Sequence, residues 1–258
     1  YFKKGLPTIV NTSFIANGFL DLYEITKEKK YLDLAESSCE FIINDLNRYN
    51  EDDSFCFSYT PVSNGACIHN ANMLGAALLA RVNHYINNDE YLENAKKSMK
   101  YSINHQNEDG SWFYGVGWKQ KWIDSFHTGY NLLALNDYIN FTNDRRYIEN
   151  LKNGYEFYLN YFFTEEGLVK YYHNKLYPLD SHAFAHAIIT LSTLSNLSER
   201  SNHILEKVIR QGIRIFWNEH SGYFFYKKDK YILSKISYIR WVQIWMFYAL
   251  IILVANYE

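Results

Sequence analysis

The chain has 258 residues, of which 48% are hydrophobic, and its formal net charge is −2. This composition supports a substantial buried core and excludes an unaided nucleic-acid binder, because no basic arm or face stands out. The three cysteines, Cys39, Cys56 and Cys67, show neither CxxC spacing nor an even number. We therefore expect no disulfide framework, no zinc site and a reducing compartment.

In chain order, the hydrophobic pattern predicts helices that alternate between buried inner and half-solvated outer ones. A first inner helix follows Pro7, with Asn11-Thr12-Ser13 as its N-cap, and an outer helix covers residues 31–46. The later inner and outer pairs are predicted at 68–85 and 91–106, at 125–141 and 147–163, and at 181–194 and 203–217, followed by an inner helix at 238–254.

Short strand-like pieces lie in the loops between these helices. They are expected at 55–59 and 111–115, and as hairpins that pair 167–172 with 175–177 and 222–226 with 231–233. The apolar run 241–255 is shorter than the roughly 20 residues of a membrane span and carries Gln243. We expect a buried helix there and no membrane span.

The inner helices begin alike, with polar residues followed by an apolar body. Aligning them places Asn11, His69, His127, His182 and Arg240 at equivalent positions, a period of roughly 55–60 residues that indicates a repeat architecture. The predicted fold is all-α, a single domain over residues 1–258. It is an α/α toroid of helical hairpins, an incomplete (α/α)6 barrel with short β-hairpins in its loops. About three more helices are expected upstream of Tyr1, where a targeting segment could also lie.

Equivalent positions of a repeat face one common cleft. His and Arg side chains at helix N-termini make such a cleft attractive to carboxylates. A lone His at a helix start is more often a cap or a core group, but three at equivalent positions favour a functional site. Neighbouring candidates in the sequence are Asn70, Asn72, Asp124, Tyr130, Asn131, Asp180, His186, Trp241 and Gln243.

Asp124 and Asp180 each precede a serine at the start of an inner helix. One interpretation is a pair of helix caps. The other is the pair of carboxylates that glycoside hydrolysis requires. The sequence leaves both open.

Aromatic residues gather in the predicted loops, Trp112, Tyr114, Trp118 and Trp122 among them. They suit a rim that stacks on sugar rings, or hairpins packed on the barrel. His182 and His186 have the i, i+4 spacing of a metal pair but no HExxH motif, so no metal or cofactor is expected.

Three sequence motifs, FHTGYN, LDSHAFAHAI and RWVQIW, resemble α/α-toroid proteins of bacterial polysaccharide biosynthesis and the C-terminal domain of glucuronyl C5-epimerases. The segment QNEDGSW is similar to the QxxxGxW motif of terpene cyclase and prenyltransferase toroids, but the acid motif DxDD is absent. Unsaturated glucuronyl hydrolases are further relatives by architecture. That resemblance implies a catalytic role for two aspartates at inner-helix starts, which match Asp124 and Asp180.

The leading hypothesis is an enzyme that abstracts the C5 proton of a uronic-acid polysaccharide or oligosaccharide, as an epimerase or lyase. His127 or His182 would be the base and Tyr130 or Tyr114 the acid, while Arg240 with His69 or Asn70 would bind the substrate carboxylate. Trp112, Trp118, Trp241 and Gln243 complete the expected binding residues. The alternatives are a glycoside hydrolase using Asp124 and Asp180, and a non-catalytic glycan-binding scaffold. A cytoplasmic location is expected, with possible attachment to polysaccharide assembly machinery, and the oligomeric state stays open.

Overall fold

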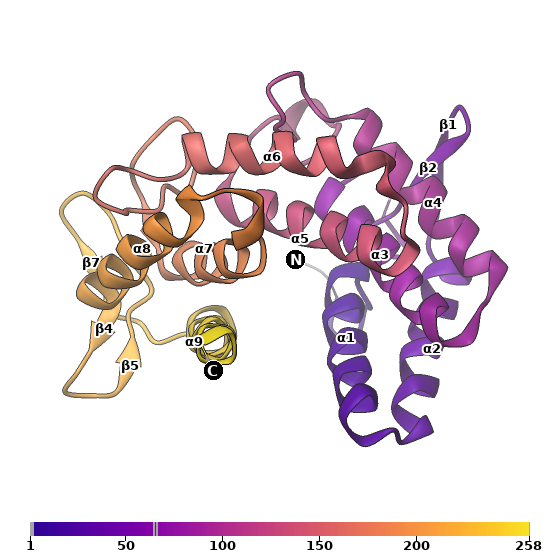
Figure 1. Ribbon diagram of the computed structural model, residues 1–258, viewed down its shortest axis with the longest axis horizontal. Coiled ribbons are helices and arrows are strands. Elements are labelled where there is room, and N and C mark those ends of the chain that lie inside the picture. Colours follow the sequence, from indigo (N-terminus) through magenta and orange to yellow (C-terminus); the bar gives the residue numbers. More distant parts are fainter. Residues whose placement is uncertain (1–2, 64, 66, 258) are drawn as a thin grey trace. The chain divides into compact units, whose positions relative to one another are not determined.

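The computed structural model describes residues 3–63, 65 and 67–257 (Figure 1). The chain forms two compact units. The first contains Tyr1–Glu108, Trp112–Lys121 and Ala134–Leu151, and the second contains Asp109–Ser111, Trp122–Leu133 and Lys152–Glu258. Helices α5 (Ser125–Thr142) and α6 (Ile148–Tyr161) contribute residues to both units. The single domain over residues 1–258 stays a prediction.

The first unit is built from helical hairpins. Its elements are α1 (Ile9–Thr26), α2 (Lys29–Asp45), β1 (Arg48–Glu51), β2 (Ser54–Phe57), α3 (His69–Ile86), α4 (Asp89–Asn104) and the 3-10 turns Trp118–Gln120 and Arg145–Tyr147. Helix α1 packs on α2 and α3, and α3 packs on α4 (Figure 1). Small residues in α3 permit this close packing: a Cβ at Gly75 would lie 3.1 Å from Ile9 Cγ1. The predicted alternation of inner and outer helices is confirmed here.

Side-chain caps and left-handed residues set the ends of these helices. The Thr8 hydroxyl accepts a hydrogen bond from the Asn11 backbone N–H (3.2 Å), so the cap lies one turn before the predicted Asn11-Thr12-Ser13 cluster. The predicted cap was therefore wrong. Helices α1 and α3 end at Lys27 and Asn87, which have φ values of 59° and 52°. Asparagine tolerates this left-handed conformation better than most residues.

A disulfide bond joins Cys56 in β2 to Cys67, immediately before α3. Both cysteines are buried, and Cys39 is the free cysteine. The expectation of no disulfide was wrong, because an odd number of cysteines still leaves one pair to form. Disulfides are typical of oxidising environments, so the cysteines give no support to a reducing compartment.

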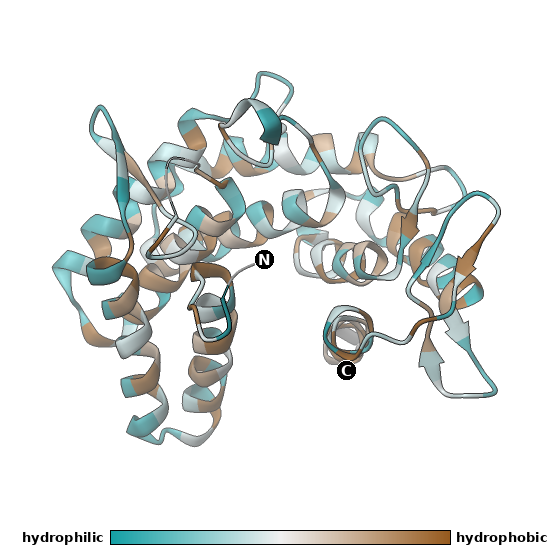
Figure 2. Cartoon of the chain, turned by 180° about the vertical axis from the view of Figure 1, so that it is seen from behind, coloured by the Kyte–Doolittle hydropathy of each residue, from teal (hydrophilic) through white to brown (hydrophobic). Residues whose placement is uncertain are grey.

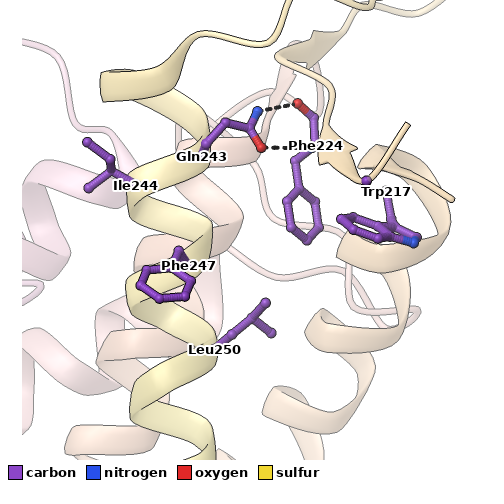
Figure 3. Close-up of a pocket in the computed structure, with 7 residues that line it drawn as sticks. Trp217, Phe224, Gln243, Ile244, Phe247 and Leu250 are labelled. Carbon is purple, nitrogen blue, oxygen red and sulfur yellow. Dashed lines mark hydrogen bonds between the residues drawn. The ribbon is translucent and has the colours of Figure 1, made fainter. Parts of the chain in front are cut away.

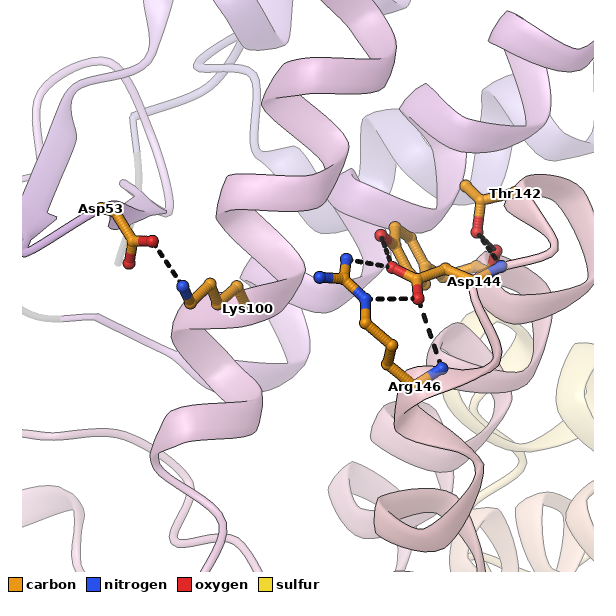
Figure 4. A network of polar contacts seen from close by, with 6 residues as sticks. Asp53, Lys100, Thr142, Asp144 and Arg146 are labelled. Atoms are coloured by element: carbon orange, nitrogen blue, oxygen red, sulfur yellow. Dashed lines mark hydrogen bonds and ion pairs between the residues drawn. The ribbon is translucent and has the colours of Figure 1, made fainter.

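Polar contacts link the loops of the first unit to its helices (Figure 4). Asp144 accepts bonds from the guanidinium of Arg146 (2.6 and 2.8 Å) and from the hydroxyl of Tyr138 (3.1 Å). Lys100 of α4 pairs with Asp53 in the β1–β2 turn at 2.5 Å. An exposed ion pair such as Lys100–Asp53 contributes only about 0–1 kcal/mol to the free energy of unfolding. The buried helix interfaces therefore account for most of the stability.

The second unit contains α7 (Ser181–Thr193), a 3-10 turn Ser195–Leu197, α8 (Arg200–Phe216), a π-helical turn Ile239–Gln243 and α9 (Ile244–Tyr257). Helix α7 packs on α8 and on α9. Strands β3 (Leu179–Asp180), β6 (Lys227–Lys228) and β7 (Leu233–Ser234) form an antiparallel sheet in the order β3-β6-β7. Strands β4 (Trp217–Asn218) and β5 (Tyr223–Phe224) form a separate hairpin.

These pairings differ from the predicted ones. The segment 222–226 does not pair with 231–233; β5 pairs with β4, which directly follows α8, and β6 pairs with β7 and with β3. Of the predicted hairpin that pairs 167–172 with 175–177, one antiparallel bridge is present, between Tyr172 and Lys175. Residues 222–233 carry no regular alternation of apolar and polar side chains that would specify a register, which explains the wrong pairing there.

Helix α9 has the strongly hydrophobic sequence IWMFYALIILVANY, and Figure 2 shows it end-on beside the C-terminal label, with brown segments. Met246, Ala249 and Leu253 are buried, whereas large side chains on another face remain exposed. The exposed members of α9 are Ile244, Phe247, Tyr248, Ile251 and Val254. The predicted fully buried helix is therefore only half buried. Among the described residues, no helix is long and apolar enough to cross a membrane.

Candidate functional site

The entrance of α5 is organised around the buried carboxylate of Asp124. One oxygen accepts the His127 backbone N–H (2.9 Å), and the other accepts the indole N–H of Trp122 (3.1 Å) and the His127 ring at Nδ1 (2.7 Å). The Asp124 side chain therefore caps the helix and holds an imidazole at the same time. The capping interpretation of Asp124 is confirmed.

His127 presents its ring at the surface of this entrance, with 22% of its side chain exposed while that of Asp124 is 1% exposed. A carboxylate can only accept a hydrogen bond, so Nδ1 of His127 must donate. The neutral ring then carries its lone pair on Nε2. Such an oriented imidazole can take up a proton at Nε2, and the negative charge of Asp124 stabilises the imidazolium that results.

His182, near the start of α7, faces α5 across the second unit. The hydroxyl of Tyr130 lies 2.9 Å from His182 Nε2. The His182 ring stacks on Trp245 (4.9 Å between centroids) and meets the edge of Trp241 (4.3 Å). Burial among these rings lowers the pKa of His182 to about 3, with a further contribution from the charge of His127. His182 is therefore neutral at physiological pH.

A glycine permits the close approach of α5 and α7 behind this pair. A Cβ at Gly129 would clash with His186 Nδ1 and lie 2.8 Å from the Thr190 hydroxyl. His186 is fully buried and lies 3.2 Å from the same hydroxyl through Nδ1. Burial holds its pKa well below the usual value. His186 is thus a neutral core residue that packs against Tyr130 (4.1 Å between rings).

Asp180 caps α7 from strand β3. Its carboxylate accepts the His182 backbone N–H (2.9 Å), and the residue is 3% exposed. Burial raises the pKa of Asp180 to about 6, partly offset by the backbone hydrogen bonds from His182 and Ala183. The capping interpretation is confirmed for Asp180 as well, and its carboxyl titrates closer to neutrality than an ordinary aspartate.

This raised pKa predicts a specific pH dependence of stability. Between the ordinary value of 3.8 and about 6, the folded protein holds a proton that the unfolded chain releases. The free energy of unfolding should therefore decrease as pH rises through this window. Asp180→Asn keeps a capping oxygen but cannot ionise, so urea unfolding at pH 4, 5, 6 and 7 should show a weaker decrease in the variant. Identical pH slopes in the two proteins would contradict the assignment.

Gln243, a predicted substrate-binding residue, is instead engaged within the protein. Its amide accepts the backbone N–H of Phe224 (2.9 Å) and donates to the carbonyl of the same residue (2.7 Å) (Figure 3). It lines an apolar pocket of about 480 Å³ with Trp217, Phe224, Ile244, Phe247 and Leu250. Because both ends of the amide are bonded to backbone, Gln243 fixes the β4–β5 hairpin on the π-helical turn.

Arg240 and Trp241 occupy the π-helical turn that precedes α9. Trp241 forms a T-shaped contact with His182 and lies 6.0 Å from Phe126, which places it beside the α5 and α7 entrances. Arg240 is exposed and forms no ion pair with any other described residue. The second unit therefore brings together Asp124, His127, Tyr130, His182 and Trp241, with Asp180 at the α7 cap.

Asn131 is buried in the second unit, and the remaining predicted residues lie in the first unit. His69 and Asn70 are buried in the first turn of α3, and the His69 backbone N–H donates to the Tyr114 carbonyl (3.1 Å). Trp112 is 1% exposed, and its indole N–H donates to the Ser102 carbonyl (2.8 Å), so it belongs to the core and not to an exposed rim. Trp118, in contrast, is 81% exposed. That the predicted site residues of both units line a single cleft stays a prediction.

Two aromatic residues of the second-unit site, Phe126 and Trp245, were not predicted as site residues, and Trp122 was predicted only as a member of an aromatic rim. Trp122 bonds Asp124, whereas Phe126 and Trp245 stack on His182 (both 4.9 Å). Their spacing from predicted site residues could have identified two of these aromatic residues in the sequence. Trp122 lies two residues before Asp124, and Trp245 lies one turn after Trp241. Within the described part of the chain, no group of His, Cys, Asp and Glu side chains has the arrangement of a metal site.

Solved structures with a similar fold are carbohydrate-active proteins. Cellobiose 2-epimerase from Bacillus thermoamylovorans has a TM-score of 0.77 at 11% identity, over 96% of this chain and 71% of that one. An unsaturated glucuronyl hydrolase specific for heparin has a TM-score of 0.74 at 13% identity, over 97% and 74%. The GH76 alpha-mannanase of Bacteroides thetaiotaomicron has a TM-score of 0.68 at 12% identity, over 86% and 65%. The fold is of the α/α-toroid type, as predicted.

The family comparison is more specific than these structural likenesses. Residues 10–233 match Glycosyl hydrolase family 76. No curated protein matches the chain. The matched region contains both capped entrances, at Asp124 and Asp180, and ends before the π-helical turn. Because the match spans most of the sequence, the chain belongs to glycosyl hydrolase family 76 and is a carbohydrate-active enzyme.

Proposed function

We propose that this enzyme modifies an acidic polysaccharide or oligosaccharide by abstracting the C5 proton of a uronic acid unit. The observation that carries the proposal is the Asp124–His127 pair, a buried carboxylate that orients a partly exposed imidazole (2.7 Å). In this mechanism His127 Nε2 takes the C5 proton, and the electron pair of the C5–H bond moves into the sugar carboxylate. A positively charged group beside that carboxylate lowers the C5–H pKa.

Tyr130 supplies the second proton-transfer group in this proposal. Its ring lies 6.2 Å from that of His127, one helical turn along α5. Return of a proton from the Tyr130 hydroxyl to the opposite face of C5 inverts the sugar, and His182 at 2.9 Å orients that hydroxyl. Loss of the substituent at C4 from the same intermediate would instead give an unsaturated product. The geometry of these side chains supports epimerase and lyase chemistry alike.

The charge of the neighbouring segment supports an acidic substrate. Between residues 222 and 245 the chain carries Lys227, Lys228, Lys230, Lys235 and Arg240 against the single acid Asp229. Strand β6 pairs Lys227 with Asp180 of β3, directly before α7. The basic segment thus begins one strand away from the α7 cap, where it can attract carboxylate groups.

Proton NMR in D₂O tests this proposal directly. The probes are polygalacturonate, polymannuronate and heparosan, with an alpha-mannan as the neutral comparison. Loss of the C5 proton signal from a uronate supports proton abstraction, and a new vinyl signal distinguishes a lyase from an epimerase. Retention of every C5 signal, with new reducing ends on any polymer, would overturn the proposal.

Glycoside hydrolysis is the second candidate, favoured by the family match and by the raised pKa of Asp180. A carboxyl that titrates near pH 6 can act as a general acid, with Asp124 as the second carboxyl of the pair. Both carboxyls are buried and cap helices, which favours the first proposal. Asp180→Asn should abolish reducing-end release if hydrolysis is the reaction, and it should leave C5 exchange within a few-fold if it is not.

A further inference from the structure

The loop of residues 115–121 in the first unit exposes a tryptophan that the packing of that unit does not use. Trp118 is 81% exposed on the short turn Trp118–Gln120, in contrast to the buried Trp112 nearby in sequence. An indole exposed to this extent costs solvation free energy unless a partner covers it. The flat face of an indole suits the axial C–H surface of a sugar ring.

The loop is rigidly built. The Gln120 side chain accepts the Gly117 backbone N–H (3.1 Å), and the Gln120 backbone N–H donates to the Gly117 carbonyl (2.8 Å). At Gly115, a Cβ would lie 2.5 Å from the Cys67 carbonyl and 2.7 Å from Gln120 Oε1, so a larger residue cannot occupy this position. The Val116 N–H donates to the same Cys67 carbonyl (3.1 Å), and Cys67 is fixed by its disulfide. A preorganised platform loses little entropy when a ligand binds.

Two lysines lie on the same loop as the exposed indole, and one of them lies against its ring. Lys119 Nζ lies 4.9 Å from the Trp118 ring centroid, and Lys121 Nζ lies 4.6 Å from that of Phe113. Neither lysine forms an ion pair with another described residue. The charge of Lys119 therefore lies beside the Trp118 ring and that of Lys121 lies beside Phe113, and both complement an anion on the ligand.

We propose that Trp118, Lys119 and Lys121 form a glycan-binding subsite for an acidic sugar unit. The indole stacks on the ring of that unit, and the two ammonium groups contact its carboxylate. This subsite rests on the proposed function for its substrate class, but it contains none of the proposed proton-transfer residues. It binds substrate and takes no part in the chemistry.

Calorimetric titration with a polygalacturonate oligosaccharide tests the subsite without turnover, because His127→Ala serves as the background in every variant. Adding Trp118→Ala should weaken binding at least 10-fold. The double change Lys119→Gln/Lys121→Gln should weaken binding to a similar extent and reduce its dependence on salt. Circular dichroism of each variant verifies that the fold is retained.

Matched controls use exposed residues of the same unit that lie outside the loop. Ile25→Ala removes an exposed apolar side chain, and Lys29→Gln/Lys96→Gln removes two exposed charges; both should leave affinity unchanged. A folded Trp118→Ala variant with unchanged affinity for the oligosaccharide would overturn the subsite even if C5 exchange is observed. Weakened binding in that variant, without C5 exchange by the wild type, would uphold the subsite and reject the proposed chemistry.

Discussion

Replacing His127 with alanine is expected to lower kcat on a uronate substrate by a factor of about 10²–10⁴, the usual contribution of a general acid–base group. The substitution removes the imidazole but keeps the backbone N–H that Asp124 accepts at 2.9 Å, so the cap of α5 survives. Initial rates of deuterium uptake at C5 provide the measurement. Added imidazole should restore part of the lost rate.

The control for this experiment is His203→Ala, an exposed histidine in the first turn of α8. It should retain full activity, which separates the loss of a particular imidazole from the loss of any histidine. Asp124→Asn should also lower kcat, because the imidazolium loses its counter-charge. A His127→Ala enzyme that is folded and as fast as the wild type would exclude His127 as the base.

Loss of the disulfide is expected to give the largest change in stability. Cys56 and Cys67 are 11 residues apart, and closing a loop of this size lowers the entropy of the unfolded chain by an amount equivalent to about 3 kcal/mol. The double change Cys56→Ser/Cys67→Ser should lower the free energy of unfolding by about that amount, measured by urea denaturation. A reducing agent should shift the wild type to the same midpoint and leave the variant unaffected. An unchanged midpoint in the variant would show that the bond contributes nothing.

Much of the fold could be predicted from the sequence, because the apolar spacing of each helix reports directly on the face that it buries. The inner helices begin at or close to the predicted positions, and His69, His127, His182 and Arg240 all lie in first turns. Strand pairing could be predicted only for the short Tyr172–Lys175 bridge. Strands of two residues carry too little pattern to choose a partner, and β6 pairs with β3 about 47 residues away in sequence, from Asp180 to Lys227.

The candidate site could be predicted only in part. The Asp124–His127 contact follows from local geometry, since a helix cap and the third helical residue are neighbours. The Tyr130–His182 contact joins two helices, and sequence gives neither the rotation of those helices nor the glycine-permitted approach at Gly129. Burial was the hardest property to predict: Trp112 and Trp118 look alike in sequence, yet one fills the core and the other lies in solvent.

The double use of the capping aspartates has a consequence for the evolution of this enzyme. Asp124 holds the start of α5 and orients His127 with the same carboxylate, and Asp180 likewise combines a cap with a raised pKa. A substitution that replaces either carboxyl to suit a new substrate also removes a helix cap, and a lost cap lowers stability by about 0.5–2 kcal/mol. Changes of specificity are therefore expected to accumulate first in the loops, where they have little effect on stability, and only later at the helix entrances.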